Sequence, residues 1–198
     1  MVILNLIRIK DWLKNILIFF PLIFSGYLFE IAYYPSLLIG FFTFSLVSSI
    51  IYITNDILDI NKDKLHPTKK HTKPLAKNLI SLKSAYLILV LLIISSLLLI
   101  YSQPSIQINI CLYLFLSLIY NISLKKIPFL ELIVLALGYV IRIDTGSKII
   151  NVESSLLMLT SVFCLGIFFI LLKRIGEINE INKNYNSRPV LKFYKLNY

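Results

Sequence analysis

Charged residues are scarce in this chain of 198 residues: Asp, Glu, Lys and Arg make up 15% of it, against about 25% in an average soluble domain. Hydrophobic residues account for 58%, and the mean hydropathy is +0.81. This balance excludes an ordinary soluble protein. We therefore interpret the chain as an integral membrane protein.

Cysteine is also scarce, because the chain has only Cys111 and Cys164. Both lie in long apolar runs, without CxxC spacing and without a neighbouring histidine. We interpret them as small packing residues and predict neither a disulfide nor a metal site for them. The N-terminus lacks a small-residue cleavage site, so residues 1–14 are predicted to stay as an interfacial segment.

Apolar runs of the length that crosses a bilayer, about 20 residues, recur along the chain. Six candidate spans lie at about 15–34, 36–54, 84–101, 105–120, 128–147 and 154–172. They predict an all-α integral membrane bundle, with residues 1–198 as a single membrane domain. Residues 55–83 form its main polar loop, and residues 173–198 form a polar tail.

Basic residues outnumber acidic ones by 20 to 10, which gives a formal net charge of +10. With the N-terminus inside, every Lys and Arg except Arg142 and Lys148 falls in a cytoplasmic segment. Such a bias orients the chain in the cell membrane and places the loop 55–83 on the cytoplasmic face. A basic rim beside anionic lipid headgroups explains the charge without any nucleic acid partner.

Carboxylates cluster where the second span ends, in the run Asn55-Asp56-Ile-Leu-Asp59-Ile-Asn-Lys-Asp63. If the helix continues through them, Asp56, Asp59 and Asp63 share one face. Carboxylates are costly beside a bilayer, and this kind of oxygen ligand suits Mg²⁺ shared with substrate phosphates. Lysines that could neutralise the remaining phosphate charge follow at once. The pattern predicts magnesium-bridged diphosphate chemistry at the membrane surface.

Ionisable residues within or beside the last two spans are further candidates. Glu131, near the cytoplasmic end of the fifth span, shares a helix face with Arg142, which lies about 16 Å further along the axis. Arg142 either lines a deep cavity or extends to the outer interface. At the end of the sixth span, Lys173 and Arg174 either bind phosphate or are positive-inside flanking residues.

Several motifs in these regions resemble one known family. Residues 8–26 (RIKDWLKNILIFFPLIFSG) resemble its opening, and residues 55–74 resemble NDxxDxxxDxxHPxKxxRP, with Lys73 in place of the Arg. Residues 120–146 resemble YxxxLKxxxxLDxxxxxxGFxxRxxxG, and Lys173–Glu177 with Arg188-Pro-Val-Leu resemble KRxxE and RPVL. The chain thus resembles the UbiA-type polyprenyl transferase superfamily, and within it the decaprenyl-phosphate phosphoribosyltransferase branch.

The resemblance implies an all-α bundle around a cavity in which Asn55, Asp56, Asp59 and Asp63 hold Mg²⁺ and a diphosphate, and so carry catalysis. Cations at the sixth helix, where most members have a second acidic motif, imply a polyprenyl phosphate acceptor and a soluble phosphoribosyl diphosphate donor. The substrate-binding residues implied are Lys14, Lys69, Lys70, Lys73, Tyr120, Lys125, Glu131, Arg142, Lys173, Arg174 and Glu177.

Two other functions remain open. The chain is alternatively a prenyl-diphosphate transferase for an aromatic or other lipid acceptor, or a non-catalytic membrane paralogue. Members of the family usually have nine spans, so we expect this chain to be a fragment or to depend on a partner for the remainder. The activity of the 198-residue chain alone is therefore an open question.

Overall fold

The computed structural model describes residues 2–65, 69–181 and 193–194. His66, Pro67 and Arg188 of the motifs above lie outside these residues. Every regular element among the described residues is a helix, which confirms the predicted all-α class. The elements in chain order are α1 (Val2–Leu6), η1 (Ile9–Phe19), α2 (Phe20–Phe24), η2 (Ile31–Tyr33), α3 (Tyr34–Leu58), α4 (Ile60–Leu65), α5 (Lys69–Thr72), α6 (Leu82–Ser102), η3 (Pro104–Ile106), α7 (Gln107–Ile122), η4 (Leu124–Lys126), α8 (Leu130–Ile149) and α9 (Leu156–Ile181).

Four helical segments are long and apolar enough to cross a membrane: Ile31–Leu58, Leu82–Ser102, Pro104–Ile122 and Leu156–Ile178. They overlap the second, third, fourth and sixth predicted spans. In Leu82–Ser102 and in Leu156–Ile178, only 11% of the most apolar stretch is buried inside the bundle. Their outer faces are therefore the natural lipid-facing surface of the bundle.

The fifth predicted span corresponds to α8, whose 20 residues also give about 30 Å of helix. Its hydropathy is lowered by four charged residues, Glu131, Arg142, Asp144 and Lys148. Glu131 and Arg142 are buried, because α8 packs against α9, α7 and η1. The burial of Glu131 and Arg142 explains how these two charges are accommodated: they face protein rather than lipid.

The first predicted span differs from the structure. Residues 15–34 are not one helix: the 3-10 helix η1 passes into α2, and a turn with Gly26 in the left-handed region (φ 79) ends it. A 3-10 helix rises about 2 Å per residue, so η1 and α2 together still reach about 30 Å. Pro21 lies in the first turn of α2, where a proline is tolerated, and Gly26 supplies the left-handed backbone of the turn that follows the helix.

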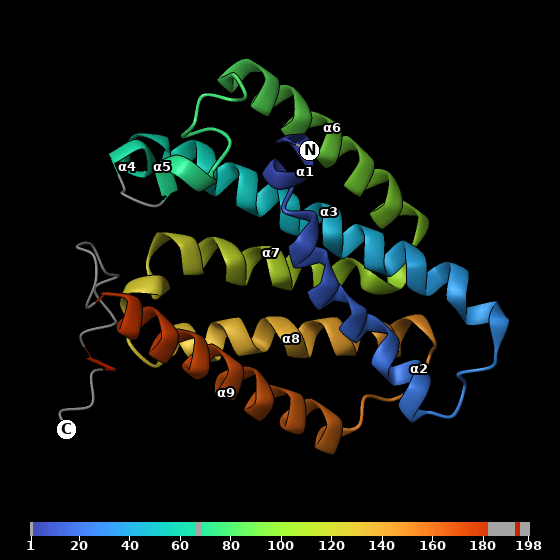
Figure 1. Cartoon of the computed structure of the whole chain (residues 1–198). Coiled ribbons are helices and arrows are strands. Elements are labelled where there is room, and N and C mark those ends of the chain that lie inside the picture. The colour runs from blue at the N-terminus through green and yellow to red at the C-terminus, as the bar shows by residue number, and fades with distance from the viewer. Residues whose placement is uncertain (1, 66–68, 182–192, 195–198) are drawn as a thin grey trace.

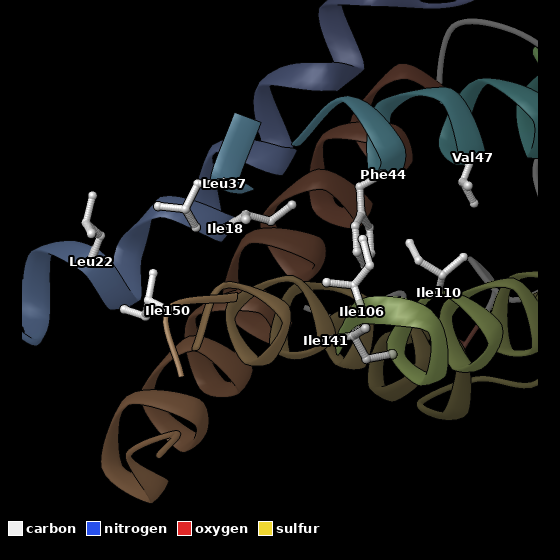
Figure 2. Close-up of a cluster of buried hydrophobic side chains, with 9 residues drawn as sticks. All are labelled: Ile18, Leu22, Leu37, Phe44, Val47, Ile106, Ile110, Ile141 and Ile150. Atoms are coloured by element: carbon white, nitrogen blue, oxygen red, sulfur yellow. The ribbon is translucent and has the colours of Figure 1, made fainter. Parts of the chain in front are cut away.

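Two buried helices organise the bundle, as Figure 1 shows: α3 packs against α6, and α8 packs against α9, while η1 contacts both α3 and α8. An apolar cluster joins η1, α3, α7 and α8 (Figure 2); its buried members are Ile18, Leu22, Leu37, Phe44, Val47, Ile106, Ile110, Ile141 and Ile150. Gly146 permits the contact of α8 with η1, because a Cβ there would lie 2.0 Å from the carbonyl oxygen of Ile18. This close packing fixes η1 beside the site described below.

Polar connections gather at one end of the bundle. In Figure 1 the α4–α5 region, the α7–α8 connection and the end of α9 lie at the same end, opposite the turn after α2 and the α8–α9 connection. The two cysteines are free and exposed on the outside of the bundle, rather than packed inside it as the sequence predicted. Their helices turn other faces inward.

Candidate functional site

A cavity of about 320 Å³ opens between η1, α3, α7, α8 and α9. Its wall contains five cationic side chains and one carboxylate, that of Asp11. Tyrosines and aliphatic side chains form much of the remaining wall. The cations are Arg8, Lys14, Arg142, Lys173 and Arg174. The composition of the wall therefore favours an anionic ligand.

The acidic run lies beside this cavity. Helix α3 ends at Leu58, but the Asp63 amide still donates to the Asp59 carbonyl at 2.9 Å, so the helical path continues almost unbroken. Asp56 and Asp63 are both buried, and both contact the ammonium of Lys73, at 2.7 and 2.6 Å. Asp59 is more exposed and lies 3.6 Å from Lys62. Two of the three predicted carboxylates therefore converge on one cation.

Arg8 connects these carboxylates to the cavity. Its backbone is left-handed (φ 53) and separates α1 from η1. The guanidinium stacks over the ring of Tyr52 at 4.6 Å and donates to Asp56 at 2.9 Å. Arg8 and Asn55 line the cavity directly. Arg8 was not identified from the sequence as a site residue, although it begins the opening motif that resembles the family.

The donor set of this cluster suits a hard cation that is shared with a substrate. Asp56 and Asp63 present carboxylate oxygens toward one positive charge, and Mg²⁺ favours such ligands together with phosphate oxygens. Over the described ranges no three His, Cys, Asp or Glu residues come together as an all-protein metal site. The residues therefore fit Mg²⁺ that a diphosphate helps to coordinate, rather than a closed structural site.

On the opposite wall, Arg174 is fully committed to carboxylates. Its Nε and one terminal nitrogen each donate to Glu131 at 2.9 Å, and the other terminal nitrogen donates to Glu177 at 2.8 Å. Arg174 and Glu131 are both buried, at 2% and 0% exposure. Lys173, which also lines the cavity, is exposed at its rim. Contact of these four residues with a substrate stays a prediction.

Arg142 lines the cavity and does not extend to the outer interface, which decides between the two readings of the sequence. It is buried, and it donates to Asn15 at 2.7 Å and to the Tyr113 hydroxyl at 2.9 Å. Asp144 pairs with Lys148 instead, at 3.0 Å. The sequence had not identified Asn15 or Tyr113, because their partnership with Arg142 joins three separate helices.

The remaining predicted residues divide into two groups. Lys14, which contacts Asp11 at 2.6 Å, and Tyr120 line the cavity. Lys70 is exposed on α5, and Lys125 is half-buried in η4; neither is part of the cavity wall. Lys69 begins α5, and its side chain lies outside what the structure describes. Substrate contact by the lysines of α5 and η4 stays a prediction.

This architecture is an all-helical bundle whose long apolar helices can cross a membrane. Residues 18–181 match the model of the UbiA prenyltransferase family, and the chain belongs to that family. Two structures of a UbiA homologue from Archaeoglobus fulgidus, one bound to DMAPP and Mg²⁺ and one to GPP and Mg²⁺, superpose with TM-scores of 0.74 and 0.73. Each is 19% identical and covers 98% of this chain and 70% of the other.

Similar sequences include proteins named decaprenyl-phosphate phosphoribosyltransferase and a protein named for nodulation. The decaprenyl-phosphate phosphoribosyltransferase of Mycobacterium tuberculosis is 29% identical over 182 residues, which are 89% of this chain and 60% of that protein. The nodulation protein NoeC of Azorhizobium caulinodans is 30% identical over 179 residues, 89% of this chain and 57% of that protein. The chain thus spans somewhat over half the length of these relatives.

Proposed function

We propose that the chain belongs to an enzyme that transfers a 5-phosphoribosyl group from phosphoribosyl diphosphate to a polyprenyl phosphate and releases pyrophosphate. The observation that carries the proposal is the cavity wall, in which cations from η1, α8, α9 and the turn before η1 surround a space bordered by a carboxylate cluster. The similarity to phosphoribosyltransferases over 89% of the chain supports the same reading.

In the proposed reaction a phosphate oxygen of the lipid attacks C1 of the ribose, and the bond from C1 to the pyrophosphate oxygen breaks. The lipid phosphate is already anionic at neutral pH, so no strong base is needed. Asn55, Asp56, Asp59 and Asp63 would hold Mg²⁺, which neutralises charge on the diphosphate when bound. Arg8 and Lys73 both contact Asp56, and we propose that they bind the departing pyrophosphate.

We place the acceptor phosphate at the opposite rim, where Lys173 carries the exposed charge. Arg174 holds Glu131 and Glu177 in position there, because its guanidinium already binds both carboxylates. The lipid chain would extend along the apolar outer faces of the bundle. We further propose the cell membrane as the location, with the loop 55–83 and the tail 173–198 in the cytoplasm and one membrane domain overall.

A prenyl-diphosphate transferase is the second candidate, because the superposed homologue was solved with DMAPP and with GPP. An assay of membranes that contain the chain and Mg²⁺ distinguishes the two candidate functions. One sample receives labelled phosphoribosyl diphosphate with polyprenyl phosphate, and the other receives labelled geranyl diphosphate with an aromatic acceptor. We expect lipid-linked label only from the first pair. Label only from the second pair contradicts the proposal, and no label from either supports a non-catalytic chain.

Asp56→Asn is the matched test of the carboxylate cluster. Its contacts to Arg8 and Lys73 become contacts of a neutral amide, so we expect lipid-linked product to fall by about 10-fold or more. Glu153→Gln, an exposed carboxylate in the connection between α8 and α9, is the control and should leave product unchanged. Equal product from Asp56→Asn and wild type would exclude the cluster from the reaction.

A further inference from the structure

Arg142 is a buried cation whose partners are neutral. It is 6% exposed, and it donates to the Asn15 amide oxygen at 2.7 Å, to the Tyr113 hydroxyl at 2.9 Å and to the Gly138 carbonyl. No carboxylate among the described residues forms an ion pair with it, whereas Arg174 binds two. Burial of a charge without a counter-ion is costly, so the buried guanidinium of Arg142 indicates a binding site for an anion from outside the chain.

The surroundings of Arg142 hold its guanidinium in place. Its centre lies 4.7 Å from the Tyr113 ring centroid, and the Phe44 and Tyr139 rings lie at 5.8 and 6.0 Å. These aromatic faces offset part of the cost of burying the charge. Asn15 donates to Ser45 at 2.9 Å, which directs its amide oxygen toward Arg142. The cation is therefore preorganised at one position in the cavity wall.

This position is the floor of the cavity. Tyr113, which binds Arg142, also contacts Ser48 of α3 at 3.1 Å. Ser48 lies two helical turns, about 10 Å, before Asn55, the residue of the acidic run that lines the cavity. The cavity thus has cationic groups at two levels: Arg8 beside the carboxylates, and Arg142 at the depth of Ser48.

We propose that Arg142 binds the phosphate monoester at the end of the donor opposite its diphosphate. This inference rests on the proposed function and deepens it, because it assigns donor specificity to the floor of the cavity. A sugar donor phosphorylated at both ends places one anionic group at each cationic level. A prenyl diphosphate ends in hydrocarbon, and burial of hydrocarbon against a guanidinium leaves that charge without a counter-ion.

Binding titrations of the detergent-solubilised chain with Mg²⁺ test this assignment, with phosphoribosyl diphosphate, pyrophosphate and geranyl diphosphate as ligands. Arg142→Gln removes the cation. Asn15→Asp keeps the cation but supplies an internal carboxylate at the present 2.7 Å contact. Lys148→Gln is the control, because it removes a cation of the same helix that pairs with Asp144 outside the cavity.

For wild type we expect tighter binding of phosphoribosyl diphosphate than of pyrophosphate. Arg142→Gln and Asn15→Asp should each weaken phosphoribosyl diphosphate by about 10-fold or more and pyrophosphate by less than about threefold. Asn15→Asp should also keep or raise the unfolding temperature, since the buried charge gains a partner. A purely structural Arg142 would tolerate this substitution without any loss of affinity.

Three results overturn the assignment: unchanged affinity for phosphoribosyl diphosphate in Asn15→Asp, equal losses for both ligands, or a wild type that does not distinguish them. If Arg142→Gln does not fold, Asn15→Asp decides. Wild-type binding of geranyl diphosphate but not of phosphoribosyl diphosphate would overturn the proposed function as well. If the variants contradict the role of Arg142 but wild type still binds phosphoribosyl diphosphate rather than geranyl diphosphate, only the assignment of Arg142 fails and the proposed function stands.

Discussion

Lys73 contacts two buried carboxylates with a single ammonium group. Its distances of 2.7 Å to Asp56 and 2.6 Å to Asp63 make it a counter-ion that two carboxylates of the acidic run share. The Lys73 side chain is 15% exposed, so it lies near solvent. A divalent ion bound between the same oxygens would have to displace this ammonium, and the displaced group would remain close to the diphosphate.

Lys73→Met therefore has a predicted effect on stability that depends on Mg²⁺. Without Mg²⁺ we expect a loss of about 3 kcal/mol of unfolding free energy, because Asp63 loses a buried partner and Asp56 keeps only Arg8. Millimolar Mg²⁺ should restore more stability to this variant than to wild type. Thermal unfolding in detergent, with and without Mg²⁺, is the measurement.

Lys70→Met is the matched control for that experiment. It removes an exposed lysine from α5, the helix that precedes Lys73, and should change stability by less than about 0.5 kcal/mol. A Lys73→Met protein as stable as wild type, or one that gains nothing from Mg²⁺, would show that Lys73 is not the counter-ion of this cluster.

At the residue scale, sequence reasoning predicted the charges of the site better than their partners. The spacing of Asp56 and Asp63 predicted a shared face, and the structure brings both to Lys73. That Glu131 would bind Arg174 could not be predicted, because their pairing depends on how α8 and α9 pack. The same limit hid Arg8, whose side chain reaches Asp56 only through the backbone turn between α1 and η1.

At the element scale, hydropathy located the long apolar helices but not the irregular N-terminal segment. Helices α3, α6, α7 and α9 follow from runs that are apolar on nearly every face. Composition does not distinguish the 3-10 helix η1 from an α-helix. The packing of η1 depends on residues far away in the sequence, such as Gly146 of α8, which lies against the backbone of Ile18.

Gly146→Ala tests that contact between elements. The added Cβ would lie 2.0 Å from the Ile18 carbonyl oxygen and 3.1 Å from Pro21, so α8 and η1 must separate. We expect a loss of about 1–3 kcal/mol in unfolding free energy. Gly176→Ala in α9 is the control: nothing lies within 4 Å of its added Cβ, and alanine favours helix, so stability should hold or rise. Equal stability of the two variants would contradict the proposed packing.

At the scale of the whole molecule, the distribution of basic residues predicts how the bundle lies in the membrane. Lys77 follows α5 at the basic end, and Glu153 lies in the connection between α8 and α9 at the other end; both are exposed. In a Cys111→Ser/Cys164→Ser background, Lys77→Cys should react with an impermeant maleimide only from the cytoplasmic side. Glu153→Cys should react only from the outer side. The reverse labelling pattern would show that the bundle has the opposite orientation in the membrane.

Helix α8 also has a consequence for biosynthesis. An Arg near the middle of a helix costs about 2.5–3.5 kcal/mol when the translocon releases that helix alone into lipid. Arg142 has this position in α8, and the groups that bind it come from η1 and α7, which are made earlier. Glu131 pairs with Arg174 of α9, which emerges from the ribosome after η1, α7 and α8. The nascent chain must therefore retain α8 beside its neighbours until α9 is made, so membrane integration of these helices is a cooperative step.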